Sequence, residues 1–118
     1  MNVETAREYS LSKKAATEDM PFGDDFLTIR VMGKMFLCIS FNTPDRITMK
    51  CDPDYAIELR DHYNGVEGAW HWNKKYWNQV FLDRDLDDKL IKQLIDHSYD
   101  EVIKKFPQKL RAKYDALP

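Results

Sequence analysis

The stretch DFLTIRVMGKMFLCISF, residues 25–41, decides the fold of this chain. Apolar side chains recur at every second position on both sides of Gly33. Such period-two alternation is typical of a strand that is buried on one face only. The two runs therefore predict an antiparallel hairpin whose apolar residues belong to one core. The residues predicted to point inward are Leu27, Ile29, Val31, Met35, Leu37, Ile39 and Phe41.

Met32-Gly33-Lys34 joins the two runs and predicts a hairpin turn. The two apolar sets lie on the same face only if the loop has an odd number of residues, which favours a loop of three. A two-residue Gly33-Lys34 turn suits the residue types, but it would put the two sets on opposite faces.

Helices are indicated by caps and by apolar spacing. Asn2 can cap a helix over residues 2–14, and Asp52 followed by Pro53 can begin a helix that extends to about His62. The longest helix is expected from Asp85, as its cap, to Phe106, because apolar residues recur there at helical spacing. Pro107 ends this helix, and residues 108–116 form a short basic tail helix.

The remaining segments complete a sheet. Residues 46–50 and 77–82 predict strands, residues 66–72 an extended segment interrupted by Gly68, and residues 17–24 a loop or irregular strand. We therefore expect one α+β domain over residues 1–118, an antiparallel sheet with helices packed on one face. The residues expected to share its core are Leu27, Ile29, Leu37, Ile39, Ile47, Leu90, Leu94, Ile95 and Val102.

Composition restricts the class of protein. The chain has 118 residues and a formal net charge of -2, so any nucleic-acid contact must come from a local basic patch. Cys38 and Cys51 lack metal-ligand spacing and indicate reduced thiols in a cytoplasmic protein, with a disulfide between them as the less favoured alternative. No apolar run approaches the roughly 20 residues that a membrane helix needs, and the polar N-terminus does not resemble a secretory signal.

Signatures of catalysis and of metal binding are missing from the sequence. It contains no G-x-S-x-G, no Walker loop, no G-x-G-x-x-G, no H-E-x-x-H and no C-x-x-C. His97 is expected to be a hydrogen-bonded structural histidine beside the core. Glu18 and Asp19 could form an acidic site, but carboxylates in a polar loop are usually turn or capping residues. We predict a protein that is not an enzyme and uses no metal or cofactor.

The stretch WHWNKKYW, residues 70–77, combines all three tryptophans with two adjacent lysines. Lysines can neutralise phosphates, and tryptophan or tyrosine can stack on unpaired bases. The alternative is that Trp70, Trp72 and Trp77 are partly buried anchors at the edge of the sheet, with Lys74 and Lys75 simply solvated.

The polar face of the predicted sheet supplies a second candidate surface. Thr28, Arg30, Arg46, Thr48 and Lys50 should share this face if the strand phases are right. It could equally be a solvated face, as antiparallel sheets often have, or the interface of a dimer. The residues predicted to contact nucleic acid are Arg30, Lys34, Arg46, Lys50, His71, Trp72, Asn73, Lys74, Lys75, Tyr76 and Trp77.

Five stretches, spread over nearly the whole chain, match a family pattern. They are residues 17–24 (TEDMPFGD), 31–36 (VMGKMF), 50–53 (KCDP), 73–78 (NKKYWN) and 94–99 (LIDHSY). With these stretches the chain resembles the MmcQ/YjbR family of small bacterial proteins. The resemblance implies an α+β fold similar to the secretion-chaperone and frataxin-like architectures. It also implies DNA binding through a winged surface.

Two positions depart from the family pattern. Many members have a histidine where this chain has Tyr76, which weakens a metal site in that motif. Many also have a Pro-Gly turn where this chain has Lys14-Ala15-Ala16, which loosens the end of the first helix. The leading hypothesis is a nucleic-acid-binding module. One alternative is a protein-interaction or chaperone-like module using the same sheet face, as a monomer or dimer. Another is a small-molecule sensor or enzyme that uses a pocket between the long helix and the aromatic stretch.

Overall fold

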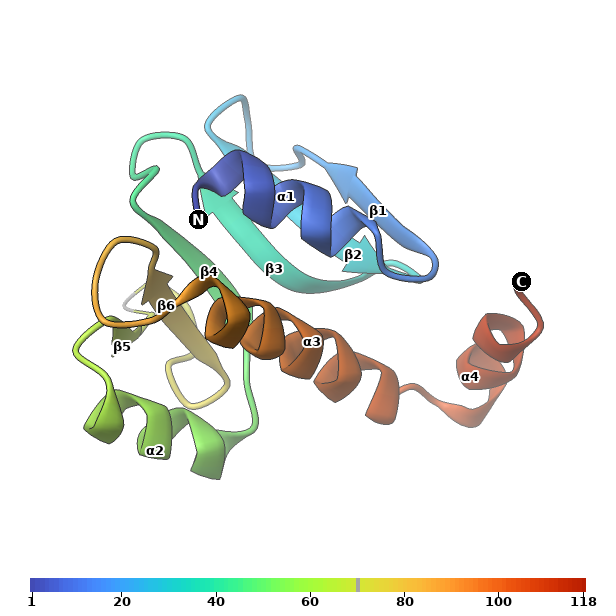
Figure 1. Ribbon diagram of the computed structural model, residues 1–118. Coiled ribbons are helices and arrows are strands. Elements are labelled where there is room, and N and C mark those ends of the chain that lie inside the picture. The colour runs from blue at the N-terminus through green and yellow to red at the C-terminus, as the bar shows by residue number, and fades with distance from the viewer. Residues whose placement is uncertain (70) are drawn as a thin grey trace.

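The hairpin of residues 25–41 lies in the middle of an antiparallel sheet with the order β1-β2-β3-β4-β6-β5. The computed structural model describes residues 1–69 and 71–118, and within these ranges the sheet has six strands. Each strand pairs antiparallel with its neighbours (Figure 1). The strands are β1 (Ala16–Asp19), β2 (Phe26–Val31), β3 (Lys34–Ser40), β4 (Arg46–Lys50), β5 (Val66–Gly68) and β6 (Trp77–Phe81).

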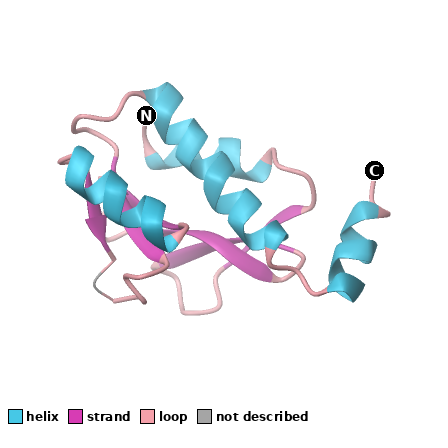
Figure 2. Ribbon diagram, turned by 90° about the horizontal axis from the view of Figure 1, so that it is seen from below, coloured by secondary structure: helices cyan, strands magenta, loops and turns pink. Residues whose placement is uncertain are grey.

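Three helices cover one face of this sheet, which we call the inner face (Figure 2). These three helices are α1 (Val3–Leu11), α2 (Pro53–His62) and α3 (Asp88–Lys104). A fourth helix, α4 (Gln108–Asp115), lies beyond the end of the sheet (Figure 1). The α+β fold predicted from the sequence is thereby confirmed. The opposite face, which we call the outer face, has no helix against it in Figure 2.

Two of the predicted caps are confirmed and one is wrong. The carboxamide of Asn2 accepts a hydrogen bond from the Thr5 N–H at 2.8 Å, and the Asp52 carboxylate accepts two from the first turn of α2. The residue that caps α3 is Asp87, not Asp85. Asp85 instead accepts hydrogen bonds from the N–H groups of residues 64 and 65, at 2.8 and 2.7 Å. A carboxylate near a helix start can satisfy either set of backbone donors, so its sequence position alone could not decide.

The turn of the hairpin differs from the predicted loop of three residues. Met32 and Gly33 alone connect paired Val31 and Lys34, and both have positive φ, 51° and 81°. This combination is typical of a type I′ turn, whose twist matches that of the flanking strands. The same-face arrangement is restored further along, because Ile29 pairs with Leu37 and Arg30 with Met35.

Phe36 is therefore an extra residue, a β-bulge in β3. It is fully buried together with Leu37, whereas Met35 lies opposite Arg30 on the outer face. The prediction that Met35 points inward is wrong for this reason. Phe41 also falls outside the prediction, since it is 48% exposed beyond the end of β3.

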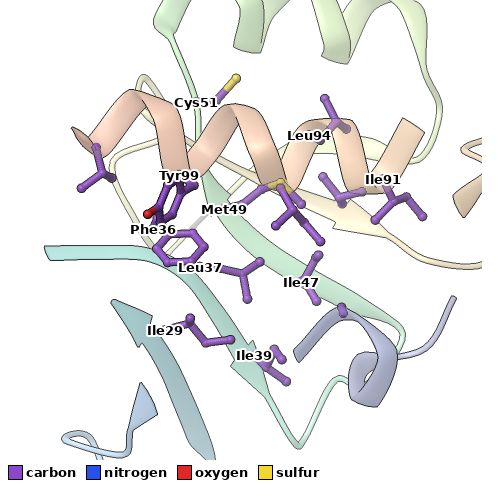
Figure 3. Close-up of a cluster of buried hydrophobic side chains, with 14 of the residues drawn as sticks. Ile29, Phe36, Leu37, Ile39, Ile47, Met49, Cys51, Ile91, Leu94 and Tyr99 are labelled. Atoms are coloured by element: carbon purple, nitrogen blue, oxygen red, sulfur yellow. The ribbon is translucent and has the colours of Figure 1, made fainter. Parts of the chain in front are cut away.

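The core lies between the inner face of the sheet and α3 (Figure 3). Phe36 packs edge-on against Tyr99 of α3, with ring centres 5.4 Å apart. Of the predicted core residues, Leu90 is half-buried at the margin and the others are buried in one cluster. Burial of large apolar side chains against α3 therefore holds the sheet in place.

Two segments differ in length from the prediction. Residues 17–24 form strand only as far as Asp19, and the rest of this segment is turn or bend with Pro21 and Gly23. The extended segment expected over 66–72 is limited to Val66–Gly68. Among the described residues, no helix is both long enough and apolar enough to cross a membrane.

Candidate nucleic-acid interface

Strand pairing places the predicted polar residues together on the outer face. Thr28 pairs with Cys38, Cys38 with Thr48, and Thr48 with Gln79 across four neighbouring strands. Directly paired residues of antiparallel strands share a face, so Arg30, Arg46 and Lys50 lie on the same side as this row. Thr28 is fully buried rather than solvated, because its hydroxyl donates to the Asp19 carboxylate from the edge strand.

The two arginines of this face are paired with carboxylates. Arg30 Nε lies 2.9 Å from Asp19 Oδ1, and Arg46 Nε lies 2.9 Å from Asp45 Oδ1. Most of their charge is therefore offset within the chain. The positive charge that is left for a ligand comes from lysines.

Three lysines surround the ring of Tyr76. The distances from Nζ to the ring centre are 5.4 Å for Lys50, 5.4 Å for Lys75 and 5.1 Å for Lys105. Lys50 also lies 5.0 Å from the ring centre of Trp77. Such cation–π contacts bring the three ammonium groups to one aromatic ring.

The sequence prediction missed Lys105. This residue follows the last turn of α3 and reaches the Tyr76 ring from another part of the chain. The only local signal in the sequence was the basic character of the segment around Pro107, and this does not indicate that Lys105 would reach Tyr76.

A recess of about 440 Å³ opens beside these lysines at the tip of the β2–β3 hairpin. We call it the basic recess, because no acidic side chain of the described residues lines it. Burial, together with the nearby charge of Lys105, lowers the pKa of Lys50, and the charge of Glu101 opposes this shift. The residues lining it are Arg30, Gly33, Lys34, Met35, Lys50, Trp77, Val102, Lys105 and Phe106.

Trp72 lies against Trp77, with ring centres 4.8 Å apart and planes inclined by 38°. Trp77 is 8% exposed, so it is largely an anchor, whereas Trp72 is half-buried and His71 is exposed. Trp72 also lines a second recess of about 350 Å³ on the outer face, which we call the aromatic recess. Its lining is Phe26, Ser40, Asn42, Thr43, Arg46, Thr48, Ala69, His71, Trp72 and Gln79.

The other predicted residues of the 70–77 stretch either form hydrogen bonds within the turn before β6 or lie beside the edge strand β5. Asn73 Oδ1 accepts a hydrogen bond from the Lys75 N–H at 3.1 Å, and the Asn73 carbonyl accepts one from the Tyr76 N–H at 3.0 Å. A Cβ at Gly68 would meet the Lys74 stem at 3.2 Å, which places Lys74 beside β5. Trp70 lies outside the described residues.

The residues considered for an acidic or metal site have structural partners. Glu18 accepts two hydrogen bonds from the Arg7 guanidinium, at 2.7 and 2.6 Å, and this raises the pKa of Arg7. Glu18 and Asp19 belong to opposite faces of β1, so they do not form a pair of acids. Within residues 1–69 and 71–118, no cluster of three or more histidine, cysteine or acidic residues could hold a metal ion.

Comparison with known proteins places this arrangement in a family. The family model described as YjbR matches residues 11–101. The chain belongs to the YjbR family. Escherichia coli YjbR is 27% identical over 113 residues, which cover 94% of this chain and 95% of that protein. Escherichia coli YbdF is 28% identical over 101 residues, covering 85% and 83% of the two chains.

Solved structures show the same YjbR-family fold. A Deinococcus radiodurans protein with the DUF419 domain superimposes with a TM-score of 0.87 at 29% identity, covering 98% of this chain and 88% of that one. A Pseudomonas syringae protein superimposes with a TM-score of 0.73 at 24% identity, covering 86% and 98%, and this likeness concerns the fold alone. The outer face of this YjbR-family chain therefore belongs to a recurring scaffold.

Proposed function

We propose that this protein is a non-enzymatic module that binds nucleic acid through its outer face and the adjoining end of the sheet, where α3 ends. The observation that supports this most directly is the lysine cluster, by which we mean Lys34, Lys50, Lys75 and Lys105. Lys34, Lys50 and Lys105 line the basic recess, and Lys75 meets Lys50 and Lys105 at the Tyr76 ring. None of the four has an ion pair with any residue that the structure describes.

Lysines that have no ion-pair partner are suited to phosphates. Burial and the nearby Lys105 charge lower the pKa of Lys50, and the Glu101 charge opposes this shift. A phosphate in the basic recess would relieve the repulsion between Lys50 and Lys105 and release counterions from the nucleic acid. The cluster therefore supplies a local attraction that the net charge of -2 does not reveal.

Three acidic residues lie at the end of α3 that is far from the lysine cluster, whereas Glu101, in its last turn, is paired with Lys104 at 2.8 Å. Asp85, Asp87 and Asp88 lie at its start, whereas Lys105 follows its last residue. A helix of 17 residues is roughly 25 Å long, which exceeds the screening length of about 8 Å at physiological salt. The acids near the start of α3 therefore do little to cancel the lysine cluster.

Salt-dependent binding of two charge-matched variants tests the proposal. The first removes two lysines of the cluster, Lys34→Ala with Lys105→Ala, and the second removes two exposed lysines of α3, Lys89→Ala with Lys92→Ala. Both lower the net charge equally, so they differ only in the position of the lost charge. Affinity for a labelled oligonucleotide is measured by fluorescence anisotropy from low to moderate salt.

Removal of the cluster lysines should reduce the slope of log affinity against log salt by about 0.7–0.9 for each lost phosphate contact. The α3 pair should leave the slope unchanged. Equal losses in both variants would show that only net charge matters. No binding by the wild type up to about 100 µM at low salt, a range that even non-specific sites reach, would refute the proposal.

A second candidate function, protein interaction, is favoured by apolar exposure near the aromatic recess. Phe22 is 62% exposed, Met20 41% and Phe26 37%. If these side chains form a self-association surface, the free protein should be a dimer at micromolar concentration, with an interface of about 1,200–2,000 Å². Light scattering over a range of concentrations tests this. A monomer at every concentration would rule out self-association through these side chains.

A further inference from the structure

The aromatic recess has the chemistry of a site for a flat, uncharged heterocycle. Two of its walls are the aromatic side chains Phe26 and Trp72. The side chains of Ser40, Thr43 and Thr48 between them make no hydrogen bond with any described residue. Their hydroxyl groups are therefore available as donors and acceptors beside an aromatic surface.

Charge is nearly balanced in the aromatic recess, in contrast to the basic recess. Its guanidinium, Arg46, is bonded to Asp45 at 2.9 and 3.3 Å. A phosphate would find little free positive charge here. A nucleobase suits the recess better, since every base has a π-face for stacking and polar edges for hydroxyl groups.

The two recesses are joined by paired tryptophans. Trp72 lines the aromatic recess, Trp77 lines the basic recess, and their ring centres are 4.8 Å apart. Thr48 and Lys50, one from each recess, are next-but-one neighbours on the same face of β4. This spacing corresponds to roughly 7 Å along a strand, a distance that one nucleotide can span.

We infer that the outer face and the adjoining end of the sheet form a single-strand site, in which an unpaired base enters the aromatic recess while the adjoining phosphates lie at the lysine cluster. This inference rests on the proposed function and adds the class of nucleic acid. A duplex keeps its bases inside the stack, and extruding one costs a few kcal/mol, so its base could not enter the recess freely. Single strands should therefore bind more tightly than duplexes of the same length.

Three labelled ligands of equal length separate the role of the base from that of the phosphates. They are a single strand, its duplex, and an abasic strand that has the same phosphates but no bases. The wild type should bind the single strand roughly 5- to 150-fold more tightly than the abasic strand, the range expected for stacking of one base. The salt slopes of the single strand and the abasic strand should be alike, because their phosphate contacts are the same.

Phe26→Ala tests the recess itself, with Phe41→Ala as a matched control. Both phenylalanines are exposed, by 37% and 48%, so neither substitution should unfold the chain, and only Phe26 lines the recess. Phe26→Ala should remove most of the preference for the single strand and leave binding of the abasic strand unchanged. Phe41→Ala should alter neither affinity.

Each other result has a definite meaning. Equal affinity for single, abasic and duplex ligands would overturn the base site while leaving the proposed phosphate binding intact. A preference for the single strand that survives Phe26→Ala would place the base elsewhere and overturn this inference. No binding of any of the three ligands would refute the proposed function as well, and would favour the protein-interaction alternative.

Discussion

His97 Nε2 of α3 accepts a hydrogen bond from the backbone N–H of Asp52, at 3.1 Å, and so joins the long helix to the start of α2. Only an unprotonated ring nitrogen can accept this bond. The ring also packs edge-on against Tyr55, with centres 4.8 Å apart. The neutral imidazole is thus part of the framework on the inner face, as expected for a structural histidine.

Stability should consequently depend on pH near neutrality. Burial lowers the pKa of His97 below its ordinary value of 6.5, although Glu101 and Asp52 oppose this shift. The unfolded chain then binds the proton first, so the contribution to stability is complete above about pH 6.5 and is lost as the pH falls toward the folded value. Urea unfolding between pH 8 and 5 measures it, with a limit of about 1.4 kcal/mol per pH unit for one proton.

His97→Gln should remove this pH dependence, because an amide oxygen can accept the Asp52 bond without titrating. His62→Gln, at an exposed position, should retain it. If both variants keep the wild-type profile, another group is responsible for the loss of stability.

Both cysteines should be protected from thiol reagents in the folded protein. Cys38 and Cys51 are each 3% exposed, and burial raises the pKa of Cys38 to about 11 and that of Cys51 to about 12. Little thiolate exists at neutral pH, so modification by a disulfide reagent should be slow and should follow unfolding. Absorbance of the released thiol measures the rate. Fast reaction of Cys38 in the native protein would mean that the outer face opens readily.

Leu94→Ala should destabilise the fold by about 2–5 kcal/mol, since Leu94 is buried between α3 and the sheet. Leu90→Ala is a useful comparison, because Leu90 is half-buried at the margin of the core and its loss should cost less. Urea titration gives both values. A change below about 0.5 kcal/mol for Leu94, typical of a surface position, would contradict the packing described for α3.

Gly33→Ala should test the hairpin turn. Gly33 has a φ of 81°, and a Cβ there would have no neighbour within 4 Å, so only backbone strain would result. Positive φ costs roughly 1–2 kcal/mol for a residue with a Cβ. Lys34→Ala, one position later in the strand, should change the free energy of unfolding by less than about 0.5 kcal/mol. Equal effects of the two substitutions would argue against the two-residue turn.

Residues 25–41 and α2 show what the sequence by itself determined. Alternation along the hairpin selects one buried face, and Asp52 followed by Pro53 begins a helix, because these preferences act between near neighbours. The same holds for most of α3, whose apolar spacing selects the side that faces the sheet. The fold class and most of the core therefore followed from local patterns.

The face of the sheet on which Met35 lies was decided only by the tertiary structure. The two apolar sets of the hairpin do share a face, as the sequence predicts. A two-residue turn followed by a bulge at Phe36 produces this arrangement as well as a loop of three residues would. Packing of Phe36 against Tyr99 of α3 distinguishes the two solutions. That contact joins residues far apart in the sequence, so no local pattern could reveal it.

The candidate site also has one part that the sequence predicted and one part that only the tertiary structure decided. Arg30, Arg46 and Lys50 could be assigned to one face, because antiparallel pairing makes the side of each residue predictable. The charges left for a ligand could not be assigned, since carboxylates offset both arginines and Lys105 joins from the end of α3. Electrostatic fields depend on distances in space, and those distances exist only once the helices have packed on the sheet.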